Sequence, residues 1–216
     1  MALPWYVYLL ALGAGILAGI INTLAGSGSL ITLPMLMFLG LPSPVANATN
    51  RVGVVLQNVV GIATLRRGGK LRLDGAGWLL APAVLGGLLG ALIAVKLDKR
   101  TIDICIAVLM AIMLAVVVLD PQRWLREHPR PLPARPSVPM LLLFFAIGVY
   151  GGFIQAGVGI FLLAAMVLGV GYSLVDANGI KLVLVLAFTL VAIVVFAAGG
   201  QIVWGIGVLM AAGQGI

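Results

Sequence analysis

The feature that most constrains this chain is a polar, glycine-rich segment that occurs twice in an otherwise apolar sequence. The motif Ala25-Gly26-x-Gly28 returns as Ala156-Gly157-x-Gly159, 131 residues later. Ala46-Asn47 returns as Ala177-Asn178 at the same offset. Four further matches keep this register: Gly40 and Gly171, Val52 and Val183, Val54 and Val185, and Gly68-Gly69 and Gly199-Gly200. So many matches at one offset indicate an internal duplication.

The composition is that of a membrane protein. Hydrophobic residues make up 62% of the 216 residues and charged residues only 9%, whereas a soluble domain carries about a quarter charged residues. The charges are confined to short stretches between long apolar runs, which is typical of an all-α polytopic membrane protein. The net charge is +7, and most of the basic residues lie in the loops between apolar runs, as the positive-inside rule predicts. The lipid bilayer is therefore the expected partner, and nucleic acid is not.

The apolar runs divide the chain into two transmembrane repeats and a linker. We expect a first repeat at 1–119, a proline-rich cytoplasmic linker at 120–138 and a second repeat at 139–216. The predicted segments are 5–25, 29–42, 45–65, 76–96, 102–119, 139–156, 160–172, 175–198 and 202–216. The short segments 29–42 and 160–172 span about 20 Å of a hydrocarbon core of about 30 Å, so they are half-helices, re-entrant pieces or short buried helices. Because Ile216 corresponds to Leu85, we expect the second repeat to be C-terminally incomplete.

Basic residues predict how the repeats are oriented. Two predicted segments separate two basic groups, so both groups are expected on the cytoplasmic side. These groups are Arg66, Arg67, Lys70 and Arg72, and Arg123, Arg126, Arg130 and Arg135. Gly199-Gly200 repeats the first basic loop but has no charge nearby, which predicts that the second repeat is inverted. Five segments per repeat satisfy this arrangement, and a four-segment repeat with re-entrant loops stays open.

The two glycine-rich breaks are the first candidates for a binding site. Inside lipid, an interrupted helix is tolerated only where protein or water satisfies its backbone. In transporters with inverted repeats, such broken helices meet near the midplane and direct their positive ends at anionic substrate groups. The candidates from the breaks are Gly26, Ser27, Gly28, Gly157 and Gly159. The alternative is that these glycines only allow tight turns and close packing.

Polar side chains within the apolar runs are the second set of candidates. Lys181 occupies the position of Asn50 in the second copy, and the run that follows it contains no carboxylate. It supplies either a positive charge for an anion or a side chain that extends to the membrane interface. Arg51 presents the same two alternatives. The remaining candidates are Asn22, Asn47, Thr49, Asn50, Gln57, Gln155 and Asn178, each of which could instead join helices by hydrogen bonds.

Three pairs of glycines predict close helix contacts, and no motif predicts catalysis. The small-residue pairs are Gly15-x-x-x-Gly19, Gly86-x-x-x-Gly90 and Gly148-x-x-x-Gly152. The one histidine, His128, lies in the linker, and the six acidic residues are scattered at segment ends and in loops. No hydrolase, zinc-protease or phosphate-binding motif is present. We expect neither an enzyme nor a cofactor or metal site.

The order of these motifs resembles the TauE/SafE family, the sulfite exporters and 4-toluene sulfonate uptake permeases. The resemblance rests on Asn22-x-x-x-Gly26-x-Gly28-Ser29, on Pro34, on Ala46-Asn47-Ala48-Thr49-Asn50 and on the following Gln57, with a weaker repeat of this order in the second copy. It runs from about Leu12 to Ile216, although Ser29 stands where the family often has a glycine.

The resemblance implies secondary transport of small sulfur-containing or carboxylate anions across the bacterial inner membrane. It carries over a set of site-lining residues: Asn22, Gly26, Gly28, Asn47, Asn50, Gly157, Gly159 and Asn178. Lys181 joins this set from its charge alone. The competing hypothesis is a membrane-embedded scaffold that binds a partner through its basic linker. Homo-oligomerisation, the coupling ion and the direction of transport are left open.

Overall fold

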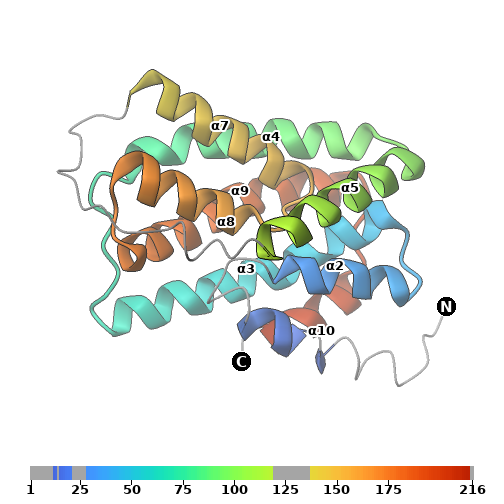
Figure 1. Ribbon diagram of the computed structural model, residues 1–216. Coiled ribbons are helices and arrows are strands. Elements are labelled where there is room, and N and C mark those ends of the chain that lie inside the picture. Colours follow the sequence, from blue (N-terminus) through green and yellow to red (C-terminus); the bar gives the residue numbers. More distant parts are fainter. Residues whose placement is uncertain (1–11, 14, 21–27, 119–136, 215–216) are drawn as a thin grey trace.

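The protein is a bundle of helices, as predicted. The computed structural model describes residues 12–13, 15–20, 28–118 and 137–214 (Figure 1). Every regular element in these ranges is helical, and residues 12–13 and 15–20 are helical as well. The remaining elements are α2 (Ser29–Phe38), α3 (Ser43–Arg67), α4 (Gly77–Lys96), α5 (Lys99–Val118), α7 (Val138–Phe153), α8 (Val158–Ala164), η1 (Ala165–Val170), α9 (Leu174–Ala198) and α10 (Trp204–Gln214).

Helix lengths agree with a membrane protein. By length and composition, α4 and α9 can each cross a bilayer, and α2, α7 and the α8–η1 segment are shorter apolar helices. η1 continues α8 as a π-helix, so the two form one helical segment from Val158 to Val170. The predicted short segments 29–42 and 160–172 are therefore helical up to Phe38 and Val170. Most of the predicted linker, 120–138, lies outside the described residues.

The internal repeat is visible in the helix boundaries. Both ends of α9 lie 131 residues after the corresponding ends of α3. The chain leaves both helices in the same way, because Gly69 and Gly200 have the same positive φ of 65°. The amide of Gly68 donates to Thr64 and that of Gly199 donates to Val195, both at 3.0 Å. The two copies thus share a local structure that the sequence offset predicted.

Capping side chains set the starts of two helices. Ser173 Oγ accepts a hydrogen bond of 3.1 Å from the Asp176 amide at the start of α9. Asp98 caps α5, because it accepts from the Thr101 hydroxyl at 2.6 Å and from the Thr101 amide at 3.2 Å. The Thr101 side chain contributes most to lowering the pKa of the Asp98 carboxyl below its usual value.

The fourth helix of each copy packs on the other copy. α4 belongs to the first copy, yet its most extensive contacts are with α7 and α9 of the second (Figure 1). α10 belongs to the second copy, yet it packs on α3. It also meets the helical residues 15–20 through Met210, Gly213 and Gln214. The copies are therefore interlocked by a reciprocal exchange of helices.

The predicted small-residue pairs lie at these exchanged contacts. A Cβ at Gly152 would overlap the carbonyl of Gly87, and a Cβ at Gly90 would overlap the carbonyl of Val149. Gly15 and Gly19 contact the backbone of α10 in the same manner, with a built Cβ only 2.8 Å from the Met210 carbonyl oxygen and 2.9 Å from that of Gln214. Only glycine permits this approach of two backbones, so the packing role predicted for these pairs is confirmed.

α3 and α9 cross at the centre of the molecule and run in opposite directions. A Cβ on Gly61 would lie 3.0 Å from the Leu182 side chain, and one on Gly179 would lie 3.7 Å from the Leu65 side chain. The two helices are therefore antiparallel. Opposite directions of equivalent helices are what an inverted repeat requires, and the inversion of the two copies as wholes stays a prediction.

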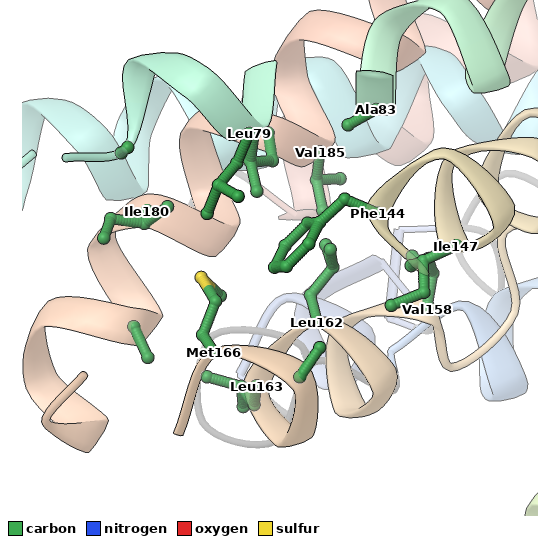
Figure 2. Close-up of a cluster of buried hydrophobic side chains, with 14 of the residues drawn as sticks. Leu79, Ala83, Phe144, Ile147, Val158, Leu162, Leu163, Met166, Ile180 and Val185 are labelled. Carbon is green, nitrogen blue, oxygen red and sulfur yellow. The ribbon is translucent and has the colours of Figure 1, made fainter. Parts of the chain in front are cut away.

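One apolar cluster lies beside this crossing. Figure 2 shows Phe144 of α7, Leu162 of α8 and Met166 of η1, which are fully buried in this cluster. Phe188 of α9 is fully buried in the same cluster. Leu79 and Ala83 bring the exchanged helix α4 into the same cluster. The cluster holds α8 and η1 against α9, and it thereby fixes the position of the break between α7 and α8.

Candidate functional site

The second glycine-rich segment is a tight break between α7 and α8. α7 ends at Phe153, and the chain turns through two positive φ angles, 68° at Gln155 and 71° at Gly157, before α8 begins at Val158. The amide of Val158 donates to the Gln155 carbonyl at 3.2 Å. The Tyr150 hydroxyl donates to the carbonyl of Ala156. The positive φ of Gly157 favours glycine, and a side chain there would also force the Met113 side chain to move.

A small cavity lies beside the break. Its wall combines residues of both copies: Ser29, Val54, Asn58, Gln155, Val158, Gly159, Lys181, Leu182 and Val185. None of these residues carries a carboxylate, and one carries a positive charge. The described side chains leave room for about one water molecule. Val54 and Val185 occupy equivalent positions in the repeat, which places the cavity where α3 and α9 cross.

Three of the predicted site residues come together at this cavity: Gln155, Gly159 and Lys181. Lys181 is 2% exposed, which excludes a side chain that reaches water at the surface of the described structure. Gln155 is equally buried, and its amide nitrogen donates to the Thr189 hydroxyl of α9 at 2.8 Å. The Gln155 amide oxygen is buried and has no hydrogen-bond partner among the described residues.

Asn47 and Arg51 hold the end of α7 from a neighbouring helix. They stand one turn apart on α3, and Asn47 donates to the Phe153 carbonyl at 2.8 Å. The Arg51 guanidinium donates to Gly151 at 3.0 Å and to Gly152 at 2.7 Å. The last carbonyls of a helix lack partners within the helix and carry partial negative charge. These two side chains therefore act as a cap contributed by another part of the chain.

Three further predicted residues on α3 bind other helices. Thr49 accepts a hydrogen bond of 3.0 Å from the Val203 amide, just before α10. Asn50 accepts one of 2.6 Å from the Thr32 hydroxyl of α2. Gln57 donates to the Gly19 carbonyl at 3.1 Å. Each contact joins two helices, which is the alternative role considered for these amides and hydroxyls.

The other predicted residues fall into two groups. Gly28 precedes α2, where its carbonyl accepts from the Ile31 amide at 3.0 Å. Asn178 lies near the start of α9, and its side-chain oxygen is buried without a partner among the described residues. Asn22, Gly26 and Ser27 lie outside the described residues.

Ser29 and Asn58 are cavity residues that the predicted site omitted. From the sequence, Ser29 is only a departure from the glycine of the family motif, and Asn58 is not among the predicted site residues. Asn58 is the repeat equivalent of Thr189, the residue that holds Gln155. Repeat equivalence to a polar residue in the other copy was the signal that would have identified Asn58.

No metal site is present in the described part of the chain, where no group of three or more His, Cys, Asp or Glu residues could hold an ion. The polar cavity groups are an ammonium, two amides and a hydroxyl. Such groups bind an anion by charge and hydrogen bonds. They do not resemble a paired acid and base for catalysis.

Comparison with known proteins assigns the chain to a family. A profile described as sulfite exporter TauE/SafE matches residues 11–216. A probable membrane transporter protein of Haemophilus influenzae is 27% identical over 200 residues, covering 93% of this chain and 78% of that protein. The probable membrane transporter proteins ORF9 of Sinorhizobium sp. and YfcA of Escherichia coli K12 are 27% and 25% identical, covering 93% and 92% of this chain and 76% and 73% of their own lengths. No solved structure matches the chain. Because the profile covers nearly the whole sequence, the chain is a membrane protein of the TauE/SafE family.

Proposed function

We propose that the protein is a multi-pass permease of the bacterial inner membrane that moves small sulfur-containing anions, such as sulfite or a sulfonate, by alternating access. Membership of the TauE/SafE family and the names of its relatives support a transporter. The observation that carries the choice of an anion is the cavity at the helix break, where Lys181 is the one charged residue of the wall.

The chemistry of the wall favours a compact anion with oxygen atoms. Lys181 supplies an ammonium, while the Ser29 hydroxyl and the Asn58 amide offer further hydrogen-bonding groups. α2 begins at Ser29 and the α8–η1 segment begins at Val158. The positive ends of both helices therefore add to the charge of Lys181. With one lysine and no carboxylate in the wall, a single negative charge on the substrate is compensated.

The cavity is too small for the proposed substrates, so the helices around it must move during transport. A sulfonate is larger than a water molecule, so the described arrangement must open before a substrate enters. The cavity lies at the crossing of α3 and α9, and its wall draws on both copies of the repeat. Movement of α3 relative to α9 would open this crossing toward one side of the membrane at a time.

The test is the transport current of the purified protein in proteoliposomes on a solid-supported membrane. We expect a saturable current with sulfite or a small sulfonate. Lys181→Met should lower the apparent affinity for the anion by about tenfold or more, because it removes the positive charge that binds the anion. Methionine is close to lysine in length, so the substitution changes the charge more than the shape.

Lys99→Met is the matched control. Lys99 lies at the start of α5, where its exposed ammonium pairs with Asp103 at 2.9 Å, so its loss should leave the current unchanged. Equal effects of the two substitutions would contradict the assignment of the site. The absence of current with any sulfur anion, from protein shown to be folded and inserted, would instead favour a partner-binding scaffold.

A further inference from the structure

The amide oxygen of Gln155 stands out among the polar groups of the cavity. Gln155 is 2% exposed. Its nitrogen donates to Thr189, and the oxygen accepts from no described group. A buried acceptor without a partner costs free energy, so buried polar groups nearly always have one. This oxygen belongs to a residue that lines the cavity beside Lys181.

Hydrogen bonds hold both the backbone and the side chain of Gln155. Its backbone has a positive φ of 68°, which is uncommon for a residue with a side chain. The Val158 amide donates to its carbonyl at 3.2 Å, and the Thr189 hydroxyl fixes its amide group from α9. Because the oxygen and nitrogen of an amide point in different directions, the bond to Thr189 directs the oxygen away from α9.

We propose that the site selects a monoanion that carries a hydrogen-bond donor of its own. The negative charge of the substrate faces Lys181, and its donor bonds to the Gln155 oxygen. Within the sulfur oxyanions of the proposed function, on which this inference rests, hydrogen sulfite meets both requirements. The sulfite dianion lacks the donor, and so do simple alkyl sulfinates and sulfonates.

The inference also bears on coupling. A site that accepts hydrogen sulfite and rejects the dianion carries one proton with each anion, and the proton travels on the substrate oxygen. No titrating side chain is then needed for that proton, which agrees with a cavity wall that contains no carboxylate and no histidine.

Hydrogen sulfite and methanesulfinate form a matched pair for the test. Both are pyramidal monoanions with the same number of heavy atoms, and they differ by a hydroxyl in place of a methyl group. We expect the full-length protein in proteoliposomes to transport hydrogen sulfite at least about tenfold better, because methanesulfinate would leave the Gln155 oxygen unpaired. At fixed total sulfite, transport should fall as the pH rises and the anion loses its proton, whereas methanesulfinate transport corrects for any titration of the protein.

Two substitutions separate the role of Gln155 from general damage. Gln155→Met keeps an unbranched side chain but removes the amide, so the preference for hydrogen sulfite over methanesulfinate should fall to near one. Thr189→Val, which leaves the amide in place but removes its anchor, should weaken the preference less. Gln201→Met is the control, because Gln201 also has a buried oxygen without a partner in the described structure but lies outside the cavity wall.

The outcomes are distinct. Equal transport of the two anions by the unmodified protein overturns the inference and leaves the permease in place. Better transport of methanesulfinate would also overturn it, because it would mean that the amide presents its nitrogen to the cavity. A preference that survives Gln155→Met would remove Gln155 from the explanation. If neither anion is transported but a sulfonate is, the inference fails and the permease stays in place. If no sulfur anion gives a current, the proposed function fails as well.

Discussion

Arg51 is fully buried, yet no carboxylate is among its partners in the described structure. Its guanidinium bonds to carbonyls at the end of α7 and lies 4.7 Å from the ring centroid of Phe196 in α9. A planar group with five donors suits this position, since it can bind several carbonyls at once. Arg51 thereby links α3, α7 and α9, and it supports the chain just before the cavity.

Replacing Arg51 should destabilise the protein. Arg51→Met leaves the final carbonyls of α7 short of donors, which should cost about 2 kcal/mol and lower Tm by roughly 5 °C. The measurement is thermal unfolding of the purified protein in detergent. Arg66→Met, in the exposed last turn of α3, should leave Tm within about 1 °C, since substitutions on an exposed surface have small effects. Equal melting of the two variants would mean that the cap contributes no stability.

For individual residues, the sequence predicted which polar side chains lie within apolar runs, but it could not assign their hydrogen-bond partners. Asn47, Arg51 and Lys181 all lie within apolar runs. From the sequence, Asn47 could bind an anion or join helices, whereas Arg51 and Lys181 could bind an anion or extend to the membrane interface. The partners of Asn47 and Arg51 stand about 100 residues away in the chain. No local pattern predicts that meeting, so only the folded structure separates a cap from a cavity residue.

The contact between α4 and α7 is the most extensive helix pairing in the described structure. It relies on glycines of both helices, and a single methyl group in the seam would collide with the facing backbone. Backbone atoms cannot move aside as a flexible side chain can, so the two helices would have to separate. Larger residues are therefore not tolerated at the glycines where α4 and α7 meet.

Gly152→Ala should be strongly destabilising. The added methyl group would overlap the Gly87 carbonyl, and we expect a loss of about 2 kcal/mol or more. Gly205→Ala, in the first turn of α10, is the control because nothing lies within 4 Å of its built Cβ. Thermal unfolding and the yield of monodisperse protein are the measurements. A Gly152→Ala variant as stable as the control would disprove the close seam.

At the scale of helices, the sequence predicted nearly all that is local. The equivalent ends of α3 and α9 follow from the repeated glycines, and the seam glycines were recognised by their spacing. The sequence could not predict that α4 leaves its own copy to pack on α7. Helices from either copy offer similar small and apolar faces, so the choice of partner depends on the whole assembly.

The two copies are interlocked at the scale of the whole molecule. Each copy gives its fourth helix to the other, and the cavity wall draws on both. Neither copy alone can cover the faces that receive α4 or α10. We therefore expect folding and function to require both copies together.

Splitting the chain would test this interdependence. Two fragments that meet between Pro129 and Arg130, in the predicted linker, should associate when expressed together. Each fragment expressed alone should be degraded, since its exchanged helix and its receiving face lack partners. Resistance to limited proteolysis and co-purification on a tag are the measurements. Stable accumulation of either fragment alone would contradict the reciprocal exchange.

The exchange of α4 and α10 also shows what a single copy of the repeat would lack. A gene for a single copy would have encoded a chain whose fourth helix had nowhere to pack within its own product. Two such chains could satisfy each other, because each would offer a packing face for the fourth helix of the other. Because α3 and α9 run in opposite directions, these two helices would lie antiparallel in such a pair.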